Sequence, residues 1–249
     1  SLSVRFTAIA PVYMTQHQKR LSAPDSYPIE RKSETFTVKI GAGPHGESGV
    51  PLLIFLRDVL GYADTMREAR YALNQRSVLV NGDPVSDEQR PVGLFDILTF
   101  TEREEHYRVF PARGGRLELT PIDASDAGSR LGKITGKQQV SGGDFQFTLH
   151  DGTNITQSDQ RYDTKDSVII DNQTNEVVKH LPYRENALAI AVDGEHSGDV
   201  GRIDEITVTP GSSDNIVSIQ HGDSGFETIE EYVFVIDKKF SDLNDTDIT

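Results

Sequence analysis

Residues 51–100 constrain the fold more than any other part of the chain, because two helical patterns and a turn signal follow one another there. In the first pattern, apolar residues recur at three- and four-residue spacing, which predicts one face of an amphipathic helix. Arg57 and Asp58 then face solvent, and Gly61 ends the helix. The apolar positions are Leu52, Leu53, Leu56, Val59 and Leu60.

A second helix is predicted by Thr65 and Glu68, because their spacing is that of a capping box and places the first helical residue at Met66. Ala69 and Leu73 lie on the same face as Met66 and are expected to be buried. The opposite face carries polar side chains three and four residues apart. They are Arg67, Arg70 and Asn74.

A β-hairpin is predicted directly after the helices. Residues 77–80 are mostly apolar and β-prone, and Asn81-Gly82 is the dipeptide that best tolerates the positive φ angles of a two-residue hairpin turn. After residue 100 the pattern changes to short β-prone runs, spaced by roughly ten residues, which favours small β-barrels. These runs are residues 107–110, 115–119, 144–149, 167–170, 176–179, 187–192, 203–208, 216–219 and 232–236.

Four arginines surround this helical unit in a chain whose formal net charge is -14. Guanidinium groups bind phosphate through paired hydrogen bonds, so a polyanion is the simplest ligand that explains them. The alternative is a solvated helix face whose arginines pair with nearby carboxylates, an arrangement common on protein surfaces. The four are Arg57, Arg67, Arg70 and Arg76.

Five short motifs occur in a fixed order along the chain. They are H-x-K-R-L-x-A-P at residues 17–24, G-P-H at 43–45, P-L-x-x-F-L-R at 51–57, V-N-G at 80–82 and G-x-x-G-R-I at 198–203. The helical unit with its hairpin resembles an S-four type RNA-binding domain, and the last motif resembles a KOW motif. The ordered set resembles the archaeal and eukaryotic small-subunit ribosomal protein four, the e-type family, over residues 14–240.

The resemblance implies an α+β, multidomain fold, in which a small helix-helix-hairpin RNA-binding domain precedes a β-rich central domain and a KOW or SH3-like β-barrel. Met14 is expected to be the natural start, so the preceding residues are interpreted as a non-native or extra extension. The predicted divisions are 1–13 extension, 14–50 basic N-terminal segment, 51–101 S-four type domain, 102–179 central β domain, 180–240 KOW barrel and 241–249 acidic tail.

The resemblance also implies a structural, non-enzymatic constituent of the small ribosomal subunit in the cytoplasm. Its expected partners are small-subunit ribosomal RNA and neighbouring ribosomal proteins, with no cofactor, small-molecule substrate or membrane. Contacts to phosphates would position the protein by RNA shape more than by base sequence. Asn81 is expected to supply the turn conformation. The RNA-binding candidates are Lys19, Arg20, Arg57, Arg67, Arg70, Arg76 and, from the KOW segment, Arg202.

Two other functions are left open by the residues alone. An RNA-modifying enzyme could use an S-four type domain to hold its RNA, although the segment after residue 100 shows no long helix with which to build a mixed α/β catalytic domain. A free-standing regulator could bind RNA without joining the ribosome.

The acidic composition needs a separate explanation, because RNA-binding proteins are usually basic. Asp and Glu total 39 against 25 Lys and Arg, and the excess lies beyond Arg116, where 25 acidic residues face 10 basic ones. Scarce lysine and absent cysteine accompany this excess. At molar salt the Debye length falls to roughly 3 Å, so a distant acidic surface repels phosphate weakly. The profile favours a halophilic archaeon as the source.

Several classes of site are disfavoured by the sequence. Without cysteine there can be no disulfide, thiolate nucleophile or zinc knuckle, and the seven histidines occur singly, so no metal site is predicted. No apolar run approaches the ~20 residues of a membrane helix. Residues 41–46 match G-x-G-x-x-G, but residues 47–51 separate them from the next helix, so a glycine-rich loop is predicted instead of a dinucleotide site.

Overall fold

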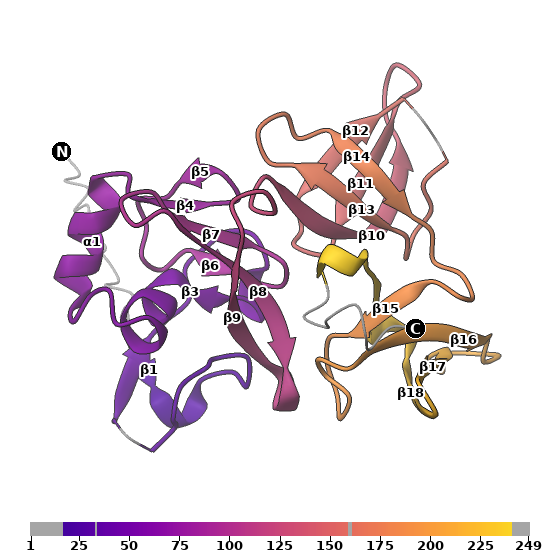
Figure 1. Ribbon diagram of the computed structural model, residues 1–249, viewed down its shortest axis with the longest axis horizontal. Coiled ribbons are helices and arrows are strands. Elements are labelled where there is room, and N and C mark those ends of the chain that lie inside the picture. The colour runs from indigo at the N-terminus through magenta and orange to yellow at the C-terminus, as the bar shows by residue number, and fades with distance from the viewer. Residues whose placement is uncertain (1–16, 33, 159–160, 241–249) are drawn as a thin grey trace, which may run out of the picture.

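The computed structural model describes residues 17–32, 34–158 and 161–240, so the predicted extension at 1–13 and tail at 241–249 lie outside the described residues. Three five-stranded antiparallel sheets and two short two-stranded sheets form this part of the chain. The first large sheet lies with α1 and β1 toward one end of the long axis, and the other two large sheets lie at the opposite end (Figure 1). The chain is therefore mostly β, with few helices and several sheets.

Short elements make up the N-terminal segment. The strand β1 (His17–Lys19) pairs with β2 (Phe36–Val38), and this pairing places Lys19 directly opposite Phe36. A loop with the predicted glycines follows β2 and contains a turn of 3-10 helix in place of a dinucleotide-binding helix. The remaining short elements are η1 (Arg20–Ser22), η2 (Gly46–Ser48), and β3 (Val50–Pro51), which pairs with β6 (Pro91–Val92).

The first predicted helix is a π-helix, η3 (Ile54–Val59), instead of an α-helix. Its C-terminal end is closed by a hydrogen bond from the Leu60 amide to the Phe55 carbonyl, five residues back, at 2.9 Å. Because hydrogen bonds to the fifth residue back widen the helix, the α-helical spacing misplaces Val59. That residue is 39% exposed, whereas Ile54 and Phe55 are buried.

The second predicted helix is α1 (Met66–Asn74), and it begins at the predicted residue. The Thr65 hydroxyl accepts a hydrogen bond from the Glu68 amide at 3.2 Å, which satisfies one of the free donors of the first turn. Ala69 and Leu73 are buried and Met66 is partly buried, so the inward face is the predicted one.

The first large sheet contains the predicted hairpin. Asn81 and Gly82 connect two of its strands with φ angles of 52° and 86°, as a type I′ turn requires. The sheet extends to Ile122, because residues 105–108 pair with residues 97–100 and residues 116–122 pair with residues 106–112. These two strands therefore belong to the first sheet and not to the central one. In spatial order the strands are β5 (Asp83–Pro84), β4 (Val78–Val80), β7 (Ile97–Phe100), β8 (Glu105–Ala112) and β9 (Arg116–Ile122), with η4 (Arg113–Gly115) between the last two.

The central sheet is built around its longest strand, β10 (Ser129–Gln139), which the sequence pattern did not predict. Its glycines and lysines weaken the β-strand pattern of the sequence. Gly132 has a packing role. A Cβ atom on Gly132 would lie 3.1 Å from the Leu149 side chain, so the glycine leaves room for that neighbour. The other strands are β12 (Asn154–Gln157), β11 (Phe145–Leu149), β13 (Ser167–Asp171) and β14 (Val177–Leu181).

The C-terminal sheet contains most of the KOW-like segment, because residues 200–203 belong to the strand β16 (Val200–Thr207). Gly201 allows this strand to approach its neighbour, because a Cβ atom there would lie only 2.4 Å from the Gln220 carbonyl oxygen. In spatial order the strands are β18 (Ser224–Ile229), β17 (Ile216–His221), β16 (Val200–Thr207), β15 (Leu188–Ala191) and β19 (Val233–Val235), with η5 (Glu230–Tyr232) and η6 (Lys238–Phe240) flanking the last strand.

The three large sheets are joined by one apolar cluster and by two buried cations. Phe95, Leu131 and Phe234, which belong to the three different parts, pack in the same buried cluster. The Lys133 ammonium of β10 donates to the carbonyls of Glu230, Glu231 and Val233 at 3.3, 3.0 and 2.8 Å. The Arg108 guanidinium of β8 donates to the carbonyls of Asp126 and Lys239. These cations connect the first and central sheets to the C-terminal region.

Candidate nucleic-acid interface

The outward face of α1 is held in position by the burial of its opposite face. Arg67 and Asn74 are exposed on the outward side, and no ion pair of Arg67 is found within the described residues. The guanidinium of Arg67 therefore has its hydrogen-bond donors available for a phosphate. Its exposure agrees with the outward helix face that the sequence pattern predicts, and its contact with RNA stays a prediction.

Arg70 lies on the same face but is engaged within the protein. Its Nε and Nη2 atoms donate to Glu88 Oε1 at 2.8 and 2.5 Å. The Glu88 side chain is 6% exposed, whereas that of Arg70 is 46% exposed. Hydrogen bonding to this carboxylate raises the pKa of the Arg70 guanidinium. Arg70 therefore neutralises a buried charge, and only part of its surface faces outward.

Of the two other arginines of the helical unit, Arg57 is paired with a carboxylate and Arg76 is exposed. Arg57 pairs with its neighbour Asp58, with Nη2 and Oδ2 2.9 Å apart, at the end of the π-helix. Arg76 is exposed just beyond α1 and adopts a positive φ of 57°, so the chain turns sharply at that residue. Its backbone amide donates to the Leu73 carbonyl at 2.9 Å, which closes the end of the helix.

The basic N-terminal motif places two adjacent residues in opposite environments. Lys19 is exposed on β1. Arg20 is 5% exposed, its Nε donates to the Glu30 carbonyl at 2.5 Å, and its Nη1 lies 3.2 Å from Glu34 Oε2. The Arg20 side chain therefore holds the loop that follows β1, and its predicted contact with RNA stays a prediction.

Arg202 lies far from the other candidates. Its strand β16 belongs to the C-terminal sheet, at the opposite end of the long axis from α1 and β1 (Figure 1). The side chain is exposed, and Nη1 donates to the Asn186 carbonyl at 3.1 Å. The candidates thus divide into a group on β1, η1, η3 and α1 and a single residue on the C-terminal sheet.

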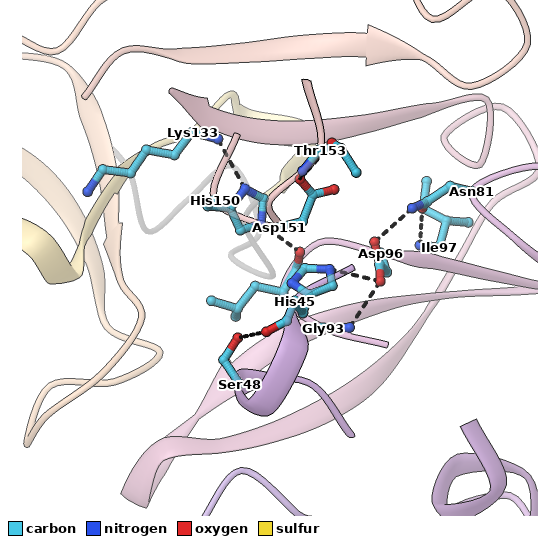
Figure 2. Close-up of polar contacts among 11 residues, drawn as sticks. His45, Ser48, Asn81, Gly93, Asp96, Ile97, Lys133, His150, Asp151 and Thr153 are labelled. Carbon is cyan, nitrogen blue, oxygen red and sulfur yellow. Dashed lines mark hydrogen bonds and ion pairs between the residues drawn. The ribbon is translucent and has the colours of Figure 1, made fainter. Parts of the chain in front are cut away.

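A buried ion pair, which the sequence did not predict, lies where the glycine-rich loop meets the first and central sheets (Figure 2). His45 Nε2 and Asp96 Oδ2 are 3.0 Å apart, and the two side chains are 3% and 5% exposed. Asp96 also accepts hydrogen bonds from the Asn81 amide group at 2.7 Å and from the Gly93 backbone amide at 3.0 Å. The carboxylate therefore has three partners in the protein interior.

The protonation states in this cluster follow from its surroundings. Burial opposes charge on both members of the pair, but their mutual attraction prevails, so the pKa of Asp96 is lowered to about 2 and that of His45 is raised. Burial, together with the charge on His45, lowers the pKa of His150 to about 4. His150 is neutral at pH 7: it accepts from the Lys133 amide at Nδ1 and faces the Leu94 carbonyl through Nε2.

This cluster gives two of the sequence motifs a structural role. Asn81 of the V-N-G motif donates to Asp96, and its Oδ1 accepts from the Ile97 amide at 2.9 Å, so Asn81 supports the turn. His45 of the G-P-H motif pairs with Asp96, and its backbone amide donates to the Asp151 carbonyl of the central sheet at 2.7 Å. No local pattern indicates this arrangement, because the participating residues are far apart in sequence.

The fold and the surface define a modular β protein with a small helical unit whose outward face carries arginines. Residues 103–177 match the ribosomal family S4e, and residues 13–48 match the RS4NT domain. The chain belongs to the small ribosomal subunit protein eS4 family, as its motifs predict.

Three relatives from archaea illustrate the similarity. The small ribosomal subunit protein eS4 of Haloarcula marismortui is 64% identical over 92% of this chain and 98% of its own length, and that of Halobacterium salinarum is 58% identical over 93% and 100%. The crystal structure of the 30S ribosomal protein S4e from Thermoplasma acidophilum matches with a TM-score of 0.67 and 29% identity, over 78% of this chain and 98% of that chain. Haloarcula marismortui and Halobacterium salinarum are halophilic archaea, in agreement with the acidic composition of this chain.

Two further properties concern the described residues. No helix in them is long and apolar enough to cross a membrane. They also contain no group of three His, Cys, Asp or Glu side chains placed to hold a metal ion.

Proposed function

We propose that this chain is a structural constituent of the small ribosomal subunit and binds its ribosomal RNA. The identity of 64% to a protein named small ribosomal subunit protein eS4, over nearly the whole of that protein, carries the proposal. The role is structural and not enzymatic, and it places the chain in the cytoplasm with the ribosome. Neighbouring ribosomal proteins are its further partners.

The proposed RNA contacts lie on the helical unit and the strand β1. Arg67, Arg76 and Lys19 have exposed cationic groups and form the primary phosphate-binding set. Arg57 contributes the donors that Asp58 does not engage, and Arg70 contributes the positive charge of a side chain that is 46% exposed. Arg202 contributes a separate contact from the KOW-like segment. Arg20 supports the N-terminal loop from within. Residues 51–101 act as the S-four type domain and residues 180–240 as the KOW barrel.

Sedimentation of cell lysate in molar KCl with magnesium tests this function. The protein is expected to travel with small subunits and to remain there after a second gradient in the same salt. A protein that stays with free soluble proteins, while still binding RNA, would be a regulator and would contradict the proposal. Changed nucleosides in small-subunit RNA after deletion of the gene, with subunit composition unaltered, would identify an RNA-modifying enzyme instead.

A further inference from the structure

Two aromatic side chains are exposed without a structural reason. The chain has 11 Phe and 8 Tyr. Among the Phe and Tyr residues that the structure describes, only Tyr71 and Phe36 are exposed, with 70% and 55% of their surface accessible. A contact outside the isolated chain would remove these rings from water, which is favourable because aromatic side chains bury a large apolar area.

Tyr71 lies on the outward face of α1 among the candidate RNA-binding arginines. It follows Arg67 by one helical turn and Arg70 by one residue. Residues four apart are neighbours on a helix surface, so the ring stands beside the guanidinium that has no carboxylate partner within the described residues. The exposed Gln75 is its neighbour on the other side.

Phe36 repeats this arrangement on a different element. It lies directly opposite Lys19 in the β1 and β2 pair, and residues paired in this way direct their side chains to the same face of the sheet. His17 packs against the Phe36 ring in a T-shaped contact, with ring centroids 6.1 Å apart, and Phe36 stays 55% exposed beside it. Both exposed aromatics are thus adjacent to cations that the sequence selected as RNA-binding candidates.

We propose that Tyr71 and Phe36 are stacking platforms for unpaired bases of small-subunit ribosomal RNA, an inference that rests on the proposed function. The neighbouring cations would bind the phosphates on either side of each stacked base. Strips of aromatic and cationic side chains match single-stranded RNA, because every base has a planar apolar face and every nucleotide carries a charge. In Figure 1, α1 and β1 lie at the same end of the molecule, so one RNA could reach both.

The acidic composition gives this contact a special importance. Phosphate contacts weaken as salt rises, because the counterions displaced from the RNA enter a more concentrated solution and their release gains less free energy. Stacking involves no net charge and is not screened. The chain has a net charge of -14 and is 64% and 58% identical to proteins of two halophilic archaea. Stacking then supplies the part of RNA affinity that persists in molar salt.

The test measures binding of purified haloarchaeal small-subunit ribosomal RNA as a function of KCl concentration. Tyr71→Gln removes the ring and keeps helix propensity, and Phe36→Leu removes the ring and keeps an apolar side chain. Each is expected to weaken binding by about 5- to 150-fold at every salt concentration, the range of one base-aromatic stack. The slope of log affinity against log salt should stay unchanged. Tyr71→Phe and Phe36→Tyr should bind like the wild type.

The control is Val178→Thr, which removes a similarly exposed apolar side chain from β14 in the central sheet and should leave binding unchanged. Wild-type affinity in Tyr71→Gln and Phe36→Leu would overturn the inference, and so would a loss in Tyr71→Phe equal to that in Tyr71→Gln. Unchanged RNA affinity with poorer incorporation into subunits would assign the rings to a protein partner and also overturn it. If the wild-type chain binds no ribosomal RNA, the proposed function itself fails.

Discussion

Arg67 and Arg70 lie three residues apart on the same helix face, yet their guanidinium groups have different surroundings. Arg70 is bound to the buried carboxylate of Glu88, whereas Arg67 has no ion-pair partner among the described residues. A carboxylate that is 6% exposed needs a cation, because burying an unpaired charge costs several kcal/mol. At the residue scale, the partner decides whether an arginine serves folding or binding.

Separate substitutions of these two arginines should therefore have different effects. Arg67→Gln should leave thermal stability nearly unchanged and reduce the slope of log RNA affinity against log salt by roughly 0.7 to 0.9, the value of one phosphate contact. Arg70→Gln should instead lower the free energy of unfolding by about 1 to 2 kcal/mol, because the buried Glu88 side chain loses the hydrogen bonds that Arg70 donates to it. The double variant Arg70→Gln with Glu88→Gln should recover part of that stability. Equal stability losses in both single variants would contradict this distinction.

The histidine and aspartate cluster should make stability depend on pH. His150 has a pKa of about 4 in the folded protein against 6.5 unfolded, so the unfolded chain binds more protons and stability falls as pH decreases from 6.5 to 4. The loss should be on the order of 3 kcal/mol. The pKa of Asp96 is lowered from 3.8 to about 2, so a further loss of stability follows as pH falls from 3.8 to 2. His45, whose pKa is raised, contributes stability that is lost as pH rises through its folded value.

Chemical unfolding of the wild type and of His150→Gln at several pH values measures the first effect. The variant should show a flatter dependence between pH 6.5 and 4, whatever its absolute stability. Parallel curves in that window would mean that His150 is not the residue responsible.

At the scale of elements, backbone contacts outweigh the local propensity of several segments. The first helical segment buries five consecutive residues, 52–56, which an α-helix with one apolar face would not do, and it adopts a π-helix. The longest strand, β10, contains glycines and lysines that weaken its sequence signal, yet it holds the centre of a sheet. In both cases the neighbouring elements determine the conformation.

Gly201 should be essential for the C-terminal sheet. Gly201→Ala places a Cβ atom 2.4 Å from the Gln220 carbonyl oxygen, so β16 and β17 must move apart, which should cost about 1 to 3 kcal/mol of stability. Gly128→Ala is the matched control, because a Cβ atom at Gly128 meets no atom within 4 Å. Amide hydrogen exchange should show lower protection in β16 and β17 for the first variant only. An unperturbed exchange pattern would count against this role.

At the scale of the whole molecule, the sheets are joined by buried cations, while the surface is strongly acidic. Lys133 and Arg108 are 6% and 1% exposed and bind backbone carbonyls of the C-terminal region. Carbonyl oxygens carry no full charge, so these contacts remain effective in concentrated salt, where ion pairs on the surface are screened. The acidic excess lies in residues 117–249, which contribute 25 acidic and 10 basic residues.

Dialysis to low salt should therefore destabilise the isolated protein, because its crowded carboxylates are no longer screened. Circular dichroism should show loss of cooperative structure in dilute buffer and recovery when KCl is restored. Sucrose stabilises folded proteins without screening charge, so it should restore less structure than KCl. A cooperative fold of unchanged stability in dilute buffer would contradict the prediction.

The sequence by itself determined the elements whose signals are local. The capping residues of α1, the Asn81-Gly82 turn and the face that buries Ala69 and Leu73 depend on neighbours within a few residues, and the structure has all three. The five short motifs also indicated the family, because their residues and their order along the chain can be read without knowing the fold. The tertiary structure alone decided the pairing of Arg70 with Glu88, the burial of Arg20 and the cluster of His45, Asp96 and His150. These contacts join residues that are distant in sequence, and burial and charge act on them only after the chain has folded.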